Sequence, residues 1–392
     1  MLSNSSRDVV VVDAVRTPFG RKNGWLSDVH PVNLLGAVQA AIFQRNDVDP
    51  LEVGQVVGGC VGQVGAQTMN VTRTAWLAAG LPQDVASTTV DSQCGSSQQA
   101  SAIAYSMVAA GVIDVAVACG VEVMSKVPMG SAVPIDPSVG KPINRDYFKY
   151  HEPTTQFEAA ERVAEQWEIS REDCDGFGQL SQQRAAQAWS EDRFGSQIIP
   201  VTVPGADDGP TSVVDRDEGL RDTTLEGLAA LKPTGRPNGV HTAGSSSQIA
   251  DGASAMLLMT EERAEALQLE PLAQIVDACL VGSDPTMMLT GPILATQHLL
   301  KRNQLSLNDI DLIEINEAFA SVVLAWQREL DADLERTNPN GGAIALGHPL
   351  GATGVALIAK AVHELARTGL ERSLVTMCCG GGLGTGTLLR RI

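Results

Sequence analysis

The stretch GATGVALIAKAVHELARTGLERSLVTMCCG, residues 351–380, carries the pattern that decides the fold. A glycine turn is followed by an amphipathic helical run, a polar break and a Val-rich strand that ends in Cys and Gly. The same features follow in the same order in GSSQQASAIAYSMVAAGVIDVAVACG, residues 95–120. The two stretches form a weak internal repeat with an offset of about 257 residues.

The repeat extends outward from these stretches. Helical patterns occur at 34–46 and 292–303, and each is followed by an acidic turn and a short apolar strand, at 49–61 and 306–318. Strands that alternate with helices predict a parallel sheet with helices on both faces. We therefore expect an α/β fold in which two pseudo-symmetric strand-helix halves pack as helix-covered sheet layers.

The middle of the chain has a different character. Residues 121–268 contain Pro and Gly clusters and a polar helical pattern from 158 to 189. Such a stretch is typical of an inserted loop domain that contacts substrate. We expect a first half at 1–120, an inserted loop domain at 121–268 that returns to the first half, and a second half at 269–392.

Composition excludes some functions. The 392 residues are 44% hydrophobic and 19% charged, as in globular proteins, and the formal charge is −18. Such a charge disfavours nucleic acids and anionic membranes as partners, although a local basic pocket could bind a small anion. No apolar run reaches the roughly 18 residues of a membrane span. The N-terminal Val run is typical of a buried strand and not of a signal peptide. The cysteines number seven, an odd count, so we expect reduced thiols and a cytoplasmic protein.

The segment CCGGGLGTG, residues 378–386, places two cysteines before a glycine run. A dinucleotide-binding loop would have to open a helix, and only a last strand can follow here. Metal binding is disfavoured because adjacent cysteines rarely chelate one ion and no CxxC or HxxxH partner exists. A buried turn with cysteines as small apolar residues stays open.

Pseudo-symmetry would bring the helix starts at Gly95 and Gly351 to one cleft. Cys94 directly precedes the first, and His348 lies just before the second. A helix N-terminus stabilises a thiolate, and a nearby histidine can take its proton. The alternatives are a packed small cysteine and a capping or core histidine.

A polar pair, Asn316 and Glu317, follows an apolar strand in NEAFA, residues 316–320. Strand ends beside a cleft carry binding groups in α/β proteins. The alternative is that Asn316 caps a helix whose first turn is acidic.

In combination these segments resemble those of the thiolases, from about residue 7 to 392. The segments that carry the resemblance are QCGSSQQA (93–100), HTAGSSSQIADGASA (241–255), NEAFA, GGAIALGHPLGATG (341–354) and CCGGGLGTG. The resemblance implies the thiolase fold and cleavage of a 3-ketoacyl-CoA by a second CoA, or the reverse Claisen condensation. It disfavours a decarboxylating ketoacyl synthase, which uses two histidines, or His and Asn, beside its cysteine.

The resemblance also implies roles for single residues. Cys94 would be the nucleophile that accepts the acyl group, and His348 would hold it as thiolate and donate to the thioester oxygen. Cys378 would be the acid/base. Asn316 would hold a water that stabilises the enolate oxygen, and the N–H of Gly380 would complete an oxyanion hole with that of Cys94.

Coenzyme A is implied as a substrate, with acyl-CoA thioesters as partners, no tightly bound cofactor, no metal and a homodimer or homotetramer as the assembly. The implied CoA-binding residues are Ser247, Arg221, Ala243, Gly244 and Phe319. Arg216, Lys232 and Arg236 would join Arg221 in a local basic cluster.

Three departures from the family pattern bear on the substrate. TTQFEAAE, residues 154–161, stands where short-chain thiolases have a His–Met pair, Gly227 replaces a serine, and Ser97 replaces a glycine. The first departure favours a larger acyl group, so we expect a degradative 3-ketoacyl-CoA thiolase. The sequences TTQFEAAE and QCGSSQQA are similar to those of degradative thiolases, including thiolases that act on steroid-derived acyl-CoAs. The alternatives are a biosynthetic acetoacetyl-CoA thiolase and a non-catalytic lipid carrier.

Overall fold

The structure is a computed structural model that describes residues 7–133, 136–204 and 210–392. Residues 1–6 of the predicted first half, and 134–135 and 205–209 of the predicted insertion, lie outside the described residues. Every helix in the described part of the chain is too short or too polar to cross a membrane.

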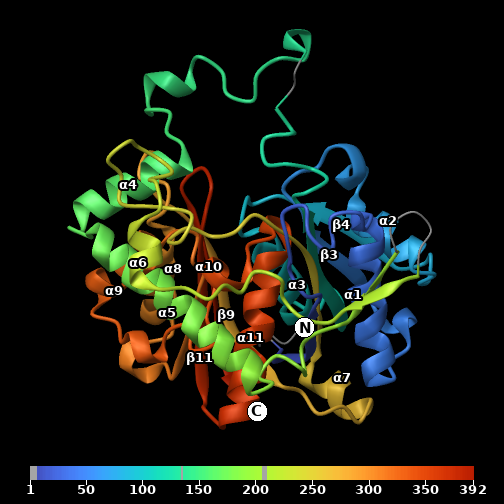
Figure 1. Cartoon of the computed structure of the whole chain (residues 1–392). Helices are drawn as coiled ribbons and strands as arrows, with labels where there is room; N and C mark the ends of the chain where they lie inside the picture. Colours follow the sequence, from blue (N-terminus) through green and yellow to red (C-terminus); the bar gives the residue numbers. More distant parts are fainter. Residues whose placement is uncertain (1–6, 134–135, 205–209) are drawn as a thin grey trace.

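One ten-stranded sheet forms the centre of the molecule (Figure 1). Its strands, in spatial order, are β10 (Leu312–Ile315), β11 (Arg372–Cys379), β12 (Leu383–Arg391), β9 (Ala273–Gly282), β1 (Val9–Arg16), β8 (Ala250–Thr260), β5 (Val115–Val123), β3 (Gln55–Gly59) and β4 (Ala86–Val90), with β2 (Gly20–Arg21) beside β8. The antiparallel pair β1–β9 joins the two halves. From this junction the order β1-β8-β5-β3 is repeated by β9-β12-β11-β10, which is the pseudo-symmetry that the repeat predicts.

Helices form layers on both sides of the strands. They are α1 (Pro31–Asn46), α2 (Val71–Ala78), α3 (Ser96–Ala109), α4 (Gln156–Gln166), α5 (Arg171–Ser190), α6 (Leu225–Ala229), α7 (Glu261–Ala266), α8 (Gly291–Arg302), α9 (Ala320–Leu330), α10 (Ala343–Leu346) and α11 (Thr353–Thr368). Short 3-10 turns occur at Pro50–Glu52, Gly65–Gln67, Pro137–Val139, Tyr147–Lys149, Leu307–Asp309, Leu334–Arg336 and Leu350–Ala352. Helices α3 and α11 pack on each other and contact strands of both halves, whereas α1 and α2 cover the first half and α8 and α9 the second.

The spacing of the repeat is confirmed. The paired elements that begin 257 residues apart are β3 and β10 (Gln55 and Leu312), α3 and α11 (Ser96 and Thr353), and β5 and β11 (Val115 and Arg372). The expectation of a parallel sheet is correct only for β4-β3-β5 and for β10-β11. It is wrong for the strands that follow, because β8 and β12 return antiparallel to β5 and β11.

The insertion connects β5 to β8 and therefore interrupts the first half. It carries α4, α5, α6 and a two-stranded sheet of β6 (Val201–Val203) and β7 (Ser212–Val214). Helices α4 and α5 pack on α9 of the second half. In Figure 1 the segment that follows β5 first extends away from the sheet and then returns to α4. The insertion thus starts from one half and closes over the other, where it can form one wall of a site between them.

Candidate active site

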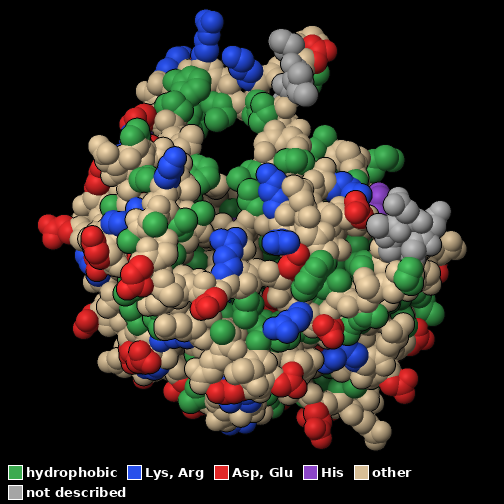
Figure 2. Space-filling model, in the orientation of Figure 1, with side chains coloured by type: hydrophobic (Ala, Val, Ile, Leu, Met, Phe, Trp, Pro, Cys, Tyr) green, Lys and Arg blue, Asp and Glu red, His purple; other side chains and the backbone are tan. Residues whose placement is uncertain are grey.

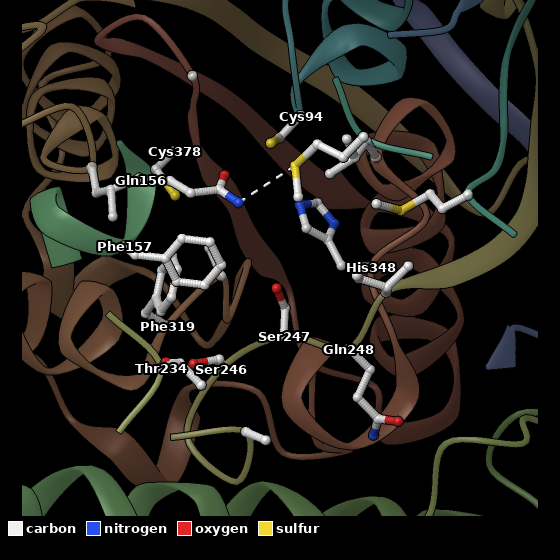
Figure 3. Close-up of a pocket in the computed structure, with 18 of the residues that line it drawn as sticks. Cys94, Gln156, Phe157, Thr234, Ser246, Ser247, Gln248, Phe319, His348 and Cys378 are labelled. Atoms are coloured by element: carbon white, nitrogen blue, oxygen red, sulfur yellow. Dashed lines mark hydrogen bonds between the residues drawn. The ribbon is translucent and has the colours of Figure 1, made fainter. Parts of the chain in front are cut away.

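A cavity of about 370 Å³ lies where the two halves and the insertion meet. Its lining residues are Arg21, Lys22, Cys94, Met124, Met129, Gln156, Phe157, Arg221, Thr234, Ala243, Ser246, Ser247, Gln248, Ile249, Met288, Leu289, Ala318, Phe319, His348, Leu350, Cys378 and Gly380. Figure 3 shows Cys94, Cys378 and His348 around one end of this space, with Ser247 opposite. The repeat predicts that the segments of Cys94 and His348 converge, and the resemblance adds those of Cys378 and Ser247.

Cys94 sits in the turn that leads into α3, with Gly95 as the N-cap. It is partly exposed, whereas the other six cysteines are buried. Burial of its sulfur raises the pKa of Cys94 to about 11, although the backbone N–H of Gly380 points to the sulfur and opposes this rise. The helix-start geometry is as predicted, but burial outweighs the helix in setting the charge of the thiol.

His348 is buried in the loop between α10 and α11. Its Nδ1 lies 2.7 Å from Oγ1 of Thr353, and that hydroxyl donates to the carbonyl of Pro349 at 2.8 Å. Since the single hydroxyl proton is used there, Nδ1 must donate to Oγ1, which leaves Nε2 as the unprotonated nitrogen. Burial lowers the pKa of His348 to about 4. The ring is therefore a neutral base with Nε2 as its acceptor.

Asn316 follows β10 and is buried beside the histidine. Its Nδ2 lies 3.3 Å from Nε2 of His348, and its Oδ1 has no hydrogen-bond partner among the described residues. The capping alternative is wrong, because α9 begins at Ala320 with Phe319 at its N-cap. Glu317 points away from the cavity. Its carboxylate accepts from Oγ of Ser181 at 2.6 Å and from donors of the 338–344 loop.

The two adjacent cysteines face opposite sides of β11. Cys378 lines the cavity. Its pKa is raised well above the usual range, mainly by burial and to a smaller extent by the nearby Cys94. Cys379 faces α3, where a Cβ added to Gly95 would lie 2.5 Å from its sulfur. The buried-turn alternative therefore describes Cys379 and not Cys378. Gly380 lines the cavity, and an added Cβ there would lie 3.1 Å from Oε1 of Gln93.

The pKa directions oppose one expectation from the sequence. With the pKa of Cys94 raised and that of His348 lowered, the pair is neutral near pH 7. These directions favour a neutral pair over the thiolate that the resemblance implies, and in a neutral pair the proton moves when the sulfur attacks. A nucleophile, a neutral base, a second thiol and the N–H of Gly380 around one space can perform acyl transfer.

Most of the predicted CoA-binding residues reach the cavity. Ser247, Ala243 and Phe319 line it, and Figure 3 shows the Ser247 side chain directed into the space. Gly244 does not line it, because it packs against α6 and an added Cβ would lie 2.2 Å from the side chain of Leu228.

The predicted basic cluster is partly wrong. Arg221 lines the cavity, but Arg236 pairs with carboxylates of α4 and Arg216 lies over the ring of Trp189 at 5.5 Å. Lys232 is exposed and outside the lining. Sequence reasoning missed Arg21 and Lys22, which β2 brings beside β8. On the face of the molecule that Figure 2 displays, Lys and Arg side chains lie around the hollow in the middle.

The wall of the cavity that the start of α4 supplies is uncharged. Gln156 and Phe157 of the predicted TTQFEAAE segment line it, and Nε2 of Gln156 lies 3.4 Å from the sulfur of Met129 (Figure 3). The ring of Phe157 meets that of Phe319 edge to face, with 5.6 Å between centroids. Met124, Met129 and Met288 also line the cavity and were missed, since single methionines carry no sequence pattern.

Glu122 is another residue that sequence reasoning missed. This buried carboxylate at the end of β5 accepts from the backbone N–H groups of Val61, Gly62 and Gly351, each at 3.0 Å, and from the amide of Gln67 at 2.7 Å. Gly351 lies three residues after His348, so Glu122 fixes the histidine loop. A charged residue inside the Val-rich strand VAVACGVEV was the available signal.

Comparisons with known proteins agree with this geometry. Residues 9–262 match the family model of the thiolase N-terminal domain, and residues 269–391 match that of the thiolase C-terminal domain. Steroid 3-ketoacyl-CoA thiolase FadA6 of Mycobacterium tuberculosis is 43% identical over 98% of this chain and 94% of its own length. A beta-ketoadipyl-CoA thiolase of Acinetobacter baylyi is 42% identical over 97% of this chain and 99% of its own.

Two solved structures have the same fold. The acetyl-CoA acetyltransferase of Bacillus anthracis is similar with a TM-score of 0.92 and 38% identity, over 100% of both chains. Human mitochondrial 3-ketoacyl-CoA thiolase is similar with a TM-score of 0.89 and 34% identity, over 98% of this chain and 99% of that one.

Proposed function

Because this chain belongs to the thiolase family, we propose that it cleaves a 3-ketoacyl-CoA with a second CoA through an acyl–Cys94 intermediate. The observation that carries the proposal is the convergence of Cys94, His348 and Cys378 on one cavity, with Nε2 of His348 in the unprotonated state.

In the first half-reaction the sulfur of Cys94 attacks the keto carbon and its proton passes to Nε2 of His348. The bond between the keto carbon and the α-carbon then breaks, which leaves an acyl thioester on Cys94 and the enolate of acetyl-CoA. Cys378 protonates that enolate and becomes a thiolate. Asn316, through a water on its unpaired Oδ1, and His348 stabilise the enolate oxygen.

In the second half-reaction the Cys378 thiolate takes the proton of the incoming CoA thiol. The CoA sulfur attacks the acyl thioester, and the N–H groups of Gly380 and Cys94 stabilise the oxyanion, a type of donor worth about 3 kcal/mol. Cys94 leaves as a thiolate and recovers its proton from His348. The products are acetyl-CoA and a shortened acyl-CoA.

The substrate we propose has a larger, uncharged acyl group. Its acyl end would lie against Gln156, Phe157 and the methionines, none of which carries charge, whereas Arg21, Lys22 and Arg221 lie near the 248–250 segment where CoA would enter. A carboxylate at the acyl end would lack a cation among these lining residues. This favours an apolar acyl group over a 3-oxoadipyl group, although relatives named for each kind are almost equally similar.

We propose a homodimer, as expected from the resemblance, with the edge of β4 as its contact. This strand ends the sheet, and each of its residues is partly or fully exposed. An unpaired edge strand presents a row of backbone N–H and C=O groups with which a strand of another chain can pair. A homotetramer built from such dimers, and a cytoplasmic location, remain predictions.

Thiolysis assays test the activity. Wild type, Cys94→Ala and Cys279→Ala would be assayed with CoA and either 3-ketooctanoyl-CoA or acetoacetyl-CoA. Cys279 is the matched control, because it is buried in β9 and does not line the cavity. We expect Cys94→Ala to lower kcat/KM by at least about 10⁴-fold and Cys279→Ala to leave it within about twofold. Preference for acetoacetyl-CoA would contradict the proposed substrate class, and turnover by Cys94→Ala would contradict the mechanism.

A further inference from the structure

A buried polar cluster lies directly behind the acyl end of the cavity and outside the catalytic residues. Glu161 of α4 accepts from Nδ1 of His241 at 2.9 Å, and Nε2 of His241 lies 2.8 Å from Oγ of Ser321 in α9. The three residues are 3%, 1% and 0% exposed. Glu161 also accepts from the backbone N–H groups of Val240 and His241, at 2.9 and 3.2 Å.

The acid–histidine–serine order is that of a catalytic triad, but the cluster cannot act as one. None of the three residues lines the cavity, and their burial leaves no path for a substrate. The hydroxyl of Ser321 has a single proton, and its Oγ lies 2.8 Å from Nε2 of His241 and 3.2 Å from the carbonyl of Ala160. Because Nδ1 donates to Glu161, Nε2 accepts from the Ser321 hydroxyl, and the ring bridges Glu161 and Ser321 at a buried position that no substrate reaches.

The neighbouring groups do not change this picture. The sulfur of Cys174, from α5, lies 3.9 Å from Nε2 of His241, and burial raises the pKa of that thiol to about 12. Despite burial, the hydrogen bonds from His241 and Val240 lower the pKa of Glu161, which keeps it a carboxylate. The described residues contain no cluster of three or more His, Cys, Asp and Glu that could hold a metal.

Three segments that line the cavity meet at this cluster. Glu161 lies one helical turn from Phe157 on α4, His241 opens the segment that carries Ser247, and Ser321 follows Phe319. The last two segments also pair through the backbone: the N–H of Ser247 donates to the carbonyl of Ala318, and that of Ala320 donates to Ser245, each at 2.9 Å. The side chain of His241 links α4 to both, beside two further links: Oγ of Ser321 lies 3.2 Å from the carbonyl of Ala160 in α4, and the backbone N–H groups of Val240 and His241 donate to Glu161.

The ring of His241 also touches the acyl wall itself. It meets the ring of Phe319 edge to face at 5.4 Å, and Phe319 in turn meets Phe157 at 5.6 Å. Edge-to-face contacts depend on ring orientation, so a shift of His241 would be transmitted to both phenylalanines. A hydrogen-bonded group with partners on both sides is also costly to displace from a buried site.

We infer that Glu161, His241 and Ser321 are positioning residues that fix Phe157 and Phe319 as one rigid wall, and that this wall sets the selectivity for a larger acyl group. The identity of the substrate in this inference rests on the proposed function, whereas the geometry of the cluster does not depend on it. Loosening the cluster should therefore weaken binding of the acyl chain while leaving the chemistry at Cys94 intact, a change in KM with little change in kcat.

Two substitutions of His241 separate its contacts. In His241→Asn the amide reaches the place of Nδ1 and can keep Glu161, whereas in His241→Gln it reaches the place of Nε2 and can keep Ser321. Because Glu161 is also held by two backbone N–H groups, we expect the bond to Ser321 to matter more. Ser321→Ala removes that bond, together with the 3.2 Å contact from Oγ to the carbonyl of Ala160, and loses only one oxygen, so it remains usable if the His241 variants do not fold.

The measurement is the ratio of kcat/KM for 3-ketooctanoyl-CoA to that for acetoacetyl-CoA. We expect the ratio to fall about tenfold in Ser321→Ala and His241→Asn, through KM, and to stay within about threefold in His241→Gln. His363→Gln is the control, since His363 bridges Ser196 and the carbonyl of Ala14 away from the cavity. An unchanged ratio in Ser321→Ala and His241→Asn, or an equal fall in His363→Gln, would overturn the inference.

A binding measurement keeps this test separate from the test of the activity. The dissociation constants of octanoyl-CoA and acetyl-CoA, measured by calorimetry on the same variants, need no turnover. We expect the preference for octanoyl-CoA to fall about tenfold in Ser321→Ala and to persist in His363→Gln. If wild type cleaved neither ketoacyl-CoA, the proposed function would fail, while an unchanged preference in Ser321→Ala would refute the role of the cluster.

Discussion

The two halves of the molecule share a topology but contribute unequally to the site. The connection from β5 to β8 in the first half spans residues 124–249, whereas the equivalent connection from β11 to β12 in the second half is the turn 380–382. The long connection supplies half of the residues that line the cavity, and the short one places Gly380 beside the sulfur of Cys94. A common framework therefore supports either binding or chemistry, according to the length of one loop.

A closer comparison concerns Glu122 and Cys379, which occupy equivalent positions 257 residues apart at the ends of β5 and β11. Each receives a backbone N–H from the turn of the other half that carries His348 or Cys94. Glu122 accepts from Gly351 at 3.0 Å, and the N–H of Gly95 points to the sulfur of Cys379. Each half thus holds the loop that carries the other half's reactive group.

The largest effect should come from the second thiol, which has no counterpart in the first half. The position equivalent to Cys378 is the fully buried Val121. We expect Cys378→Ala to lower kcat for thiolysis by at least about 10³-fold, because no other group is placed to carry the proton between the enolate and CoA. Steady-state thiolysis of 3-ketooctanoyl-CoA measures this. Retained alkylation of Cys94 by iodoacetamide would show that the fold is intact, and a fall of less than tenfold would contradict the role.

The second prediction concerns the charge of the pair that spans the two halves. A pKa of about 11 for Cys94 and about 4 for His348 makes the thiolate scarce at neutral pH. Below the pKa the thiolate fraction rises tenfold for each pH unit, so alkylation of Cys94 by iodoacetamide should speed up about 100-fold from pH 7 to pH 9. The other cysteines are buried, so mass spectrometry can follow this site. A rate that is flat above pH 6 would instead indicate a thiolate–imidazolium pair.

The repeat made the framework predictable, because strand and helix periods recur with one offset and hydrophobic patterns mark buried elements. The reactive side chains were predictable for a related reason: Cys94 and His348 lie at equivalent helix starts, which pseudo-symmetry brings together. The resemblance to thiolases then assigned Cys378 and Gly380, which spacing alone left open.

What could not be predicted depends on contacts between distant segments. The pairing of Arg236 with α4, the position of Arg21 beside the cavity and the cluster around His241 each join parts of the chain that no local pattern relates. The direction of the Cys94 pKa differs from the expected one for a similar reason. A helix N-terminus can be read from sequence, but the burial that outweighs it belongs to the folded protein.

The smallest effects should come from the two equivalent anchors, and they should be unequal. In Glu122→Gln an NH₂ group replaces one of the carboxylate oxygens that accept from backbone N–H groups. Buried donors are then left unpaired, which lowers the free energy of unfolding by about 2–3 kcal/mol. The displaced Gly351 turn would shift His348, and we expect kcat/KM to fall about tenfold. Cys379→Ala removes only a weak sulfur acceptor and a small volume, so a cost of about 1 kcal/mol and a fall in kcat/KM within about threefold are expected.

Assays of both variants well below their melting temperatures separate positioning from stability. If Glu122 positions His348, kcat/KM of Glu122→Gln should be lowered even under conditions in which the variant is fully folded. The rate at which iodoacetamide alkylates Cys94 should also change, because His348, the proton acceptor of Cys94, has moved. In Cys379→Ala that rate should change less, since Gly95 keeps its backbone hydrogen bond to the carbonyl of Ser92 at 3.2 Å. Equal effects of the two substitutions would show that the anchors are equivalent in strength as well as in position, and that the asymmetry of the halves is confined to the loops.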